Sequence, residues 1–249
     1  MRTFWPVFKR ELFAFFVTPL AWVLITVFLV VQGMHFYLLV DHFASIEEIS
    51  SDQSPVTAFF GDTVLLYLVL FLLLPPMTMR LFAEERRSGT IETLMTAPVS
   101  AFGIVMAKYL ATIVTYVAMW LPTLLYLVIL SRTGAIDWHA AAAAYLGVFL
   151  IGASYLAVGV LMSALTKSQF IAFLGTVLVI LSLFIIGVGE FIASLSPTLH
   201  AICSYVSVWS QMNDFANGVV DSRRLVYDGS LIFVPLFIAV RVVDAWKWG

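Results

Sequence analysis

The densest group of charged side chains lies between Arg80 and Ser100, in the stretch RLFAEERRSGTIETLMTAPVS. Only 11% of the 249 residues are charged, yet this stretch contains Arg80, Glu84, Glu85, Arg86, Arg87 and Glu92. Carboxylate and guanidinium groups form ion pairs and charge-assisted hydrogen bonds. The segment can therefore bind a partner protein, or its arginines can simply set the orientation of neighbouring membrane spans.

The second half of this stretch is compatible with a short amphipathic helix. We expect Ser88 to cap the helix and Glu92 to lie near its first turn, where a carboxylate suits the helix dipole. Ile91, Leu94 and Met95 have the spacing of one apolar helical face. A helix of this kind can seat in a groove on a soluble partner.

The sequence contains no pattern that predicts catalysis. The phosphate loop G-x-x-x-x-G-K-[ST] is absent, so we expect any ATP hydrolysis to come from a partner chain. The single cysteine, Cys203, has no partner for an internal disulfide. We predict no metal site, because no two of the four histidines have ligand-like spacing on one helix: His35, His42, His139 and His200.

The composition places most of the chain in a lipid bilayer. Hydrophobic residues make up 62% of the sequence, well above the share in a soluble domain. A bilayer-spanning helix needs about 20 mostly apolar residues. We predict an all-α polytopic membrane protein with six spans, at about 19–39, 62–82, 104–130, 140–165, 170–191 and 227–243.

Before the first span, residues 1–18 predict an amphipathic helix that lies in the membrane interface. Phe4, Phe8, Leu12 and Phe15 share one face, and Lys9, Arg10 and Glu11 are assigned elsewhere. The first apolar run is too long for a cleavable signal peptide, so we interpret it as an uncleaved span.

The distribution of basic residues predicts that both termini lie in the cytoplasm. With that orientation, ten of the thirteen lysines and arginines lie on the inner side. The three on the outer side are Arg132, Arg223 and Arg224. The segment 80–100 then becomes the longest cytoplasmic loop between spans.

Few ionisable groups lie within the predicted spans, which weakens the hypothesis of an ion-driven secondary transporter. We expect Lys108 and Glu190 to reach the two membrane interfaces. Asp228 and Arg241, at the ends of the sixth span, are expected to snorkel to the interfaces. Between the last two spans, residues 194–228 predict an aromatic, outer interfacial or re-entrant segment.

The fourth span is rich in small residues that allow close helix packing in lipid. Ala140 with Ala144, Ala153 with Ala157, and Gly159 with Ser163 each have small-xxx-small spacing. We interpret these pairs as packing within one chain, and a face for a second copy is the alternative.

The pattern E-E-R-R-x-G-T-x-E-x-L between two spans, followed by A-P-V-S, resembles the permease subunits of ABC-2 type transporters. Within them, PPMTMRLFAEERRSGTIETLMTAPVS, WLPTLLYLVIL and GVVDSRRLVYD most resemble permeases of gliding-motility-associated ABC transporters. The resemblance implies one ABC-2, or type V exporter-like, domain over residues 1–249. It implies that segment 80–100 is a coupling loop for an ATPase subunit, with a second contact between the fourth and fifth spans. The expected docking residues are Glu84, Glu85, Arg86, Arg87, Ser88, Gly89, Thr90, Ile91, Glu92, Leu94, Thr166, Lys167 and Ser168.

From this resemblance we expect a non-enzymatic permease of a bacterial inner membrane that takes part in export. Its partners would be a second permease chain, two ABC ATPase subunits that hold ATP and Mg²⁺, and membrane lipid, without nucleic acid. A stand-alone secondary transporter or channel, and a scaffold that anchors a cytoplasmic machine, are the alternative hypotheses.

Overall fold

Helices form all the regular secondary structure in the described part of the chain, which covers residues 4–45, 54–61, 63–91, 100–133, 136–192 and 196–246 of a computed structural model. Six helical segments are long and apolar enough to cross a membrane, by length and composition, among these residues. They run over Pro19–Ala44, Leu65–Ser88, Ala101–Arg132, Trp138–Leu165, Gln169–Phe191 and Ser222–Ala245. The predicted all-α fold with six spans is confirmed.

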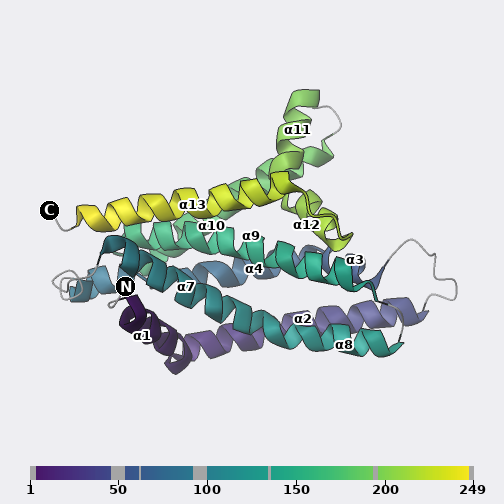
Figure 1. The fold of residues 1–249 in the computed structure, drawn as a ribbon, viewed down its shortest axis with the longest axis horizontal. Helices are drawn as coiled ribbons and strands as arrows, with labels where there is room; N and C mark the ends of the chain where they lie inside the picture. Colours follow the sequence, from purple (N-terminus) through teal and green to yellow (C-terminus); the bar gives the residue numbers. More distant parts are fainter. Residues whose placement is uncertain are drawn as a thin grey trace.

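The helices lie side by side along one long axis, with both termini at the same end (Figure 1). The elements are α1 (Phe4–Val17), α2 (Pro19–Ser45), α3 (Pro55–Phe60), α4 (Val64–Thr78), α5 (Ala83–Ser88), α7 (Ala101–Trp120), η1 (Leu121–Thr123), α8 (Leu124–Thr133), α9 (Trp138–Leu165), α10 (Gln169–Val188), η2 (Gly189–Phe191), α11 (Pro197–Val206), α12 (Val208–Ala216) and α13 (Ser222–Ala245).

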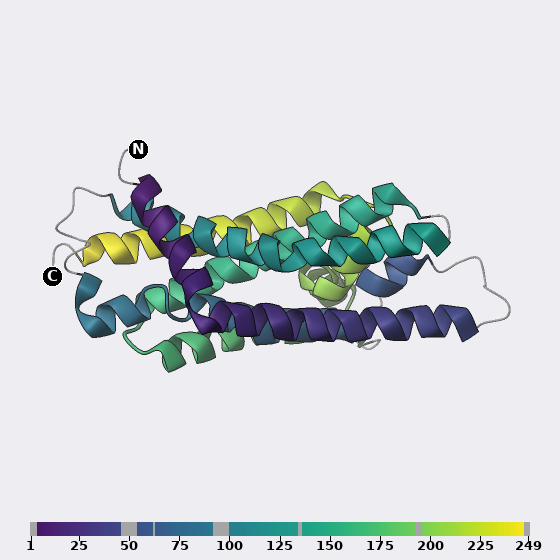
Figure 2. The same cartoon turned by 90° about the horizontal axis from the view of Figure 1, so that it is seen from below.

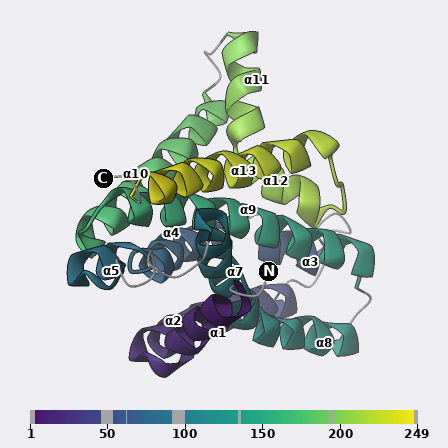
Figure 3. The same ribbon diagram turned by 60° about the vertical axis from the view of Figure 1, so that its left-hand side comes forward.

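The central element is α9, which is the most buried of the six apolar segments. It contacts α13, α10, α12, α4 and α7, and Figure 3 shows it between α13 and α4. Three glycines of α9 face bulky neighbours, because an added Cβ would overlap Phe215 at Gly147, Tyr116 at Gly152 and Thr78 at Gly159. The small residues of this helix therefore serve packing within one chain.

Helix α1 packs obliquely against α2 and α7, at the end of the bundle that holds both termini (Figure 2). The predicted apolar face is half-buried at Phe4, Phe8, Leu12 and Phe15. Its most buried positions are Val7 and Glu11, so the assignment of Glu11 away from this face is wrong. Glu11 follows Val7 by one helical turn and is only 9% exposed.

The last span begins earlier than predicted, at Ser222, because Asp221 caps it. The Asp221 carboxylate accepts a hydrogen bond of 2.8 Å from the backbone amide of Arg223. Asp228 is buried rather than snorkelled, since the Gln211 side chain of α12 donates a hydrogen bond to its carboxylate. Arg241, near the other end, is exposed as expected.

Away from the end that holds the termini, two short helices occupy much of the segment predicted to be interfacial. Helix α11 projects away from the bundle axis (Figure 1), whereas α12 packs against α9 and α3. Arg224 joins α13 to both helices: it forms an ion pair of 3.2 Å with Asp214 of α12 and donates to the carbonyl of Ser204 in α11 at 2.8 Å.

Replacing Gly159 by leucine tests the close packing of α4 on α9. The new side chain has no room beside Thr78, and we expect overpacking to lower stability by about 1–3 kcal/mol. The measurement is the thermal unfolding midpoint of the purified protein in detergent. The matched control is Gly229→Leu, because a Cβ at Gly229 meets no atom within 4 Å. Equal midpoints for the two variants would contradict the packing described for α9.

Candidate functional site

The charged segment EERR forms a short helix of its own, α5, directly after the turn that follows α4. Glu84 and Glu85 lie in its first turn and Arg86 and Arg87 in its last, the arrangement that suits the helix dipole. Gly89 ends the helix with a φ of 74°, in the left-handed region that glycine adopts readily.

The prediction that Ser88 begins a helix is wrong, because Ser88 is the last residue of α5. Its hydroxyl donates a hydrogen bond of 2.9 Å to the carbonyl of Glu84. Thr90 and Ile91 are helical again. Glu92 and Leu94 lie outside the described residues.

Ser163 of α9 holds the chain where α5 begins. Its hydroxyl oxygen accepts hydrogen bonds from the backbone amides of Phe82 at 3.0 Å and Ala83 at 3.2 Å, and it donates to the carbonyl of Met79 at 3.1 Å. The first amides of a helix have no partner within the helix, so the hydroxyl supplies one. The start of α5 is therefore fixed to α9.

Arg86 holds α5 from its other side. Its guanidinium donates a hydrogen bond of 3.0 Å to the carbonyl of Ala164. The same group lies over the ring of Trp246, 4.5 Å from its centroid, just beyond α13. This predicted docking residue thus points toward α9 and α13 and not only into solvent.

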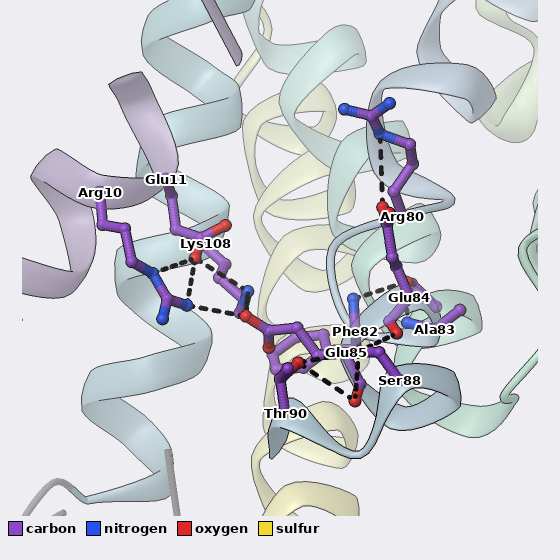
Figure 4. Close-up of polar contacts among 11 residues, drawn as sticks. Arg10, Glu11, Arg80, Phe82, Ala83, Glu84, Glu85, Ser88, Thr90 and Lys108 are labelled. Carbon is purple, nitrogen blue, oxygen red and sulfur yellow. Dashed lines mark hydrogen bonds and ion pairs between the residues drawn. The ribbon is translucent and has the colours of Figure 1, made fainter. Parts of the chain in front are cut away.

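The most buried charge of the site is Lys108 of α7, whose side chain is 1% exposed. Its ammonium lies 3.1 Å from a carboxylate oxygen of Glu11 in α1 and 3.1 Å from one of Glu85 in α5. Arg10 completes this Lys108 cluster, with 2.7 Å to each of the same two oxygens (Figure 4). Two cations and two carboxylates therefore join three helices that are distant in the sequence.

The cations of the cluster favour the ionised form of Glu11. Burial by itself would raise the pKa of Glu11, but the neighbouring charges of Lys108 and Arg10 outweigh burial and lower that pKa. The ammonium of Lys108 also lies 5.2 Å from the centre of the Phe82 ring. Lys108 does not extend to the surface of the chain, because two carboxylates from other helices come to it.

The remaining predicted docking residues of this segment lie at the surface. Exposed side chains or backbone are found at Glu84, Arg87, Ser88, Gly89 and Thr90, and Ile91 is half-buried. In the turn between α9 and α10, Lys167 is exposed, and Thr166 and Ser168 are half-buried. Because α5 contacts both α9 and α10, the two predicted docking segments are neighbours at the same end of the bundle.

Sequence reasoning missed four residues that position this surface: Arg10, Glu11, Lys108 and Ser163. The helical spacing of Glu11 with Val7 was a usable signal, because it places a carboxylate on a buried face. For Lys108 the signal was a lysine inside a span, which calls for a partner of opposite charge. The arrangement joins α1, α5 and α7 through ion pairs.

Replacing Lys108 by methionine tests the cluster. The variant keeps the length of the side chain but leaves two buried carboxylates without their cation, and we expect a loss of about 3–5 kcal/mol. This loss of stability is measured as a lower thermal unfolding midpoint of the purified protein in detergent. Lys167→Met, at an exposed lysine of the same end, should leave the midpoint within about 1 °C of wild type. A Lys108→Met protein as stable as the control would refute the structural role of the cluster.

Comparison with known families agrees with this arrangement. The sequence model of the ABC-2 family transporter proteins matches residues 41–222, well over half of the chain. The match begins near the end of α2 and ends at the start of α13, so it includes α5 and the turn between α9 and α10. Comparison with curated proteins found no significant match. The chain therefore belongs to the ABC-2 family of transporter proteins, as a multi-pass membrane permease.

Proposed function

We propose that this permease is driven by a separate ABC ATPase subunit, which docks on the exposed side of α5 and on the turn between α9 and α10. The observation that carries the proposal is the contrast between the two sides of α5. Glu85 and Arg86 hold the helix to the bundle, while Glu84, Arg87 and Thr90 remain exposed. A helix held firmly on one side and charged on the other suits a force-bearing contact.

The contacts of α5 supply routes by which a displacement reaches the spans. Glu85 contacts Lys108 of α7, and the same cluster joins both residues to Glu11 of α1. Hydrogen bonds to Ser163 and Ala164 join the α5 segment to α9. The contact of Arg86 with Trp246 joins it to the end of α13. A movement imposed by ATP binding in the ATPase subunit would shift these helices together, because buried ion pairs resist separation.

The assembly we propose contains two permease chains and two ATPase subunits, with ATP and Mg²⁺ bound only in the ATPases. Large apolar side chains are exposed along α2, α10 and α13, among them Val30, Ile185 and Phe233. Such faces suit lipid or a second permease chain. We further propose export across a bacterial inner membrane. The relation to gliding-motility permeases stays a prediction that rests on the sequence resemblance.

Reversing two exposed charges tests the docking surface. Arg87→Glu combined with Lys167→Glu places negative charge on both segments without touching the Lys108 cluster. We expect roughly tenfold less ABC ATPase subunit to co-purify with the membrane-inserted permease, because like charges across an interface are costly. The ATPase subunit is co-expressed, and its ratio to permease is read from a quantitative gel.

The matched control is Arg132→Glu, an exposed arginine at the opposite end of the bundle. It should co-purify the ATPase as wild type does. If the double variant also retains normal binding, the docking surface lies elsewhere. If purified permease moves solute in vesicles without any ATPase, the proposal of an ATP-driven function fails as a whole.

The proposal requires α5 to face the cytoplasm, which cysteine labelling tests. In a Cys203→Ser background, Thr90→Cys lies at the α5 end and His139→Cys at the other end of the bundle. With a membrane-impermeant maleimide, we expect His139→Cys to react in intact cells and Thr90→Cys to react only after lysis. The reverse pattern would place the docking surface on the wrong side for an ATPase.

A further inference from the structure

A cavity of about 250 Å³ lies beside the Lys108 cluster, between α1 and the corner where α4 passes into α5. Its charged walls are Arg10, Glu11, Arg80, Glu84, Glu85 and Lys108, and its apolar walls are Ala14, Phe15, Met77 and Leu81. The cavity is open to the surroundings at the inner end of the bundle. Of the exposed docking residues, Glu84 lines the cavity, whereas Arg87, Thr90 and Lys167 do not.

Arg80 is the cation of this cavity with unused hydrogen-bonding capacity. Among the described residues, it donates one hydrogen bond, of 3.2 Å, to the hydroxyl of Thr18. Its only carboxylate neighbour in that part of the chain is Glu84, at 3.8 Å, too far for a hydrogen bond. A guanidinium has five N–H donors. By contrast, Arg10 and Lys108 are occupied by Glu11 and Glu85.

Glu84 is the matching anion. Its side chain is 56% exposed, and its carboxylate is turned toward Arg80 and away from the Lys108 cluster (Figure 4). The pair therefore places a guanidinium with unused N–H donors, among the described residues, beside an exposed carboxylate. Three cations and three carboxylates line the cavity, so its formal charge is balanced. A balanced cavity suits a ligand that carries both charges more than a ligand with net charge.

The apolar part of the cavity indicates an amphipathic ligand. Phe15 and Met77 also line a narrow apolar crevice that continues between α2, α4 and α7. On the other side, α1 exposes Trp5 and Phe13, side chains that suit the membrane interface. The crevice is too narrow for an acyl chain, so we place only a headgroup and the adjoining glycerol in the cavity.

We propose that this cavity binds the headgroup of a zwitterionic phospholipid that carries a primary amine. The phosphate contacts the Arg80 guanidinium, and the ammonium contacts the Glu84 carboxylate. Binding would join α1 to the α4–α5 corner from the lipid side, beside the cluster that joins them from within. The inference does not depend on an ATPase partner, and it is tested with the permease alone.

The test measures lipid retention by native mass spectrometry. Purified permease is equilibrated in nanodiscs of equal parts phosphatidylethanolamine, phosphatidylcholine and phosphatidylglycerol, then released into detergent. We expect phosphatidylethanolamine to be retained over the other two. Phosphatidylcholine lacks N–H donors for Glu84, and phosphatidylglycerol lacks the cation. Arg80→Gln should lower the retention of phosphatidylethanolamine by about tenfold, the cost of one charge-assisted hydrogen bond.

Two further variants separate binding from general damage. Glu84→Gln should keep a bound phospholipid but lose the preference for phosphatidylethanolamine over phosphatidylcholine. Arg241→Gln, an exposed arginine of α13 outside the cavity, should retain lipid as wild type does. The proposal is overturned if Arg80→Gln retains lipid normally, or if wild type shows no headgroup preference. Neither result depends on ATPase co-purification, so either leaves the docking proposal standing.

Discussion

A buried ammonium group sets the main constraint on this structure. Lys108 lies within an apolar bundle, where an unpaired charge costs several kcal/mol, so carboxylates must reach it. Both come from other helices, Glu11 from α1 and Glu85 from α5. The positions of α1 and α5 are thus coupled through one side chain of α7. Arg10 then supplies a second cation, which contacts both carboxylates.

The small residues of α9 allow the start of α5 to attach to the bundle. Buried backbone amides need hydrogen-bond partners inside the protein, and Ser163 supplies one where α5 begins. Four residues earlier, Gly159 lets Thr78 of α4 come close enough for that bond to form. The result is a short helix joined to α1, α7, α9 and α13, with its charged outer side left exposed. The proposed docking of an ATPase subunit would need a segment attached in this way.

Most of the fold could be predicted from hydrophobic run length alone, because a bilayer demands about 20 apolar residues per span. All six spans were found in this way, and the amphipathic face of α1 followed from helical spacing. The errors concern charged residues. Lys108 and Asp228 were expected to extend to the membrane interfaces and Glu11 to lie off the apolar face of its helix, whereas all three are buried beside a partner. Ser88 was assigned to a helix start, although the glycine after it marks a helix end.

The sequence by itself determined that the chain spans a membrane six times and that its charges gather in one segment between spans. These properties depend on local composition. The composition of each stretch can be read from the sequence without knowing which residues that stretch contacts. Only the tertiary structure decided which charges of EERR face inward and which outward. That choice depends on partners such as Arg10, which lies 75 residues before Glu85. Periodicity describes the faces of one helix, whereas the stability of a buried charge depends on what another helix brings to it.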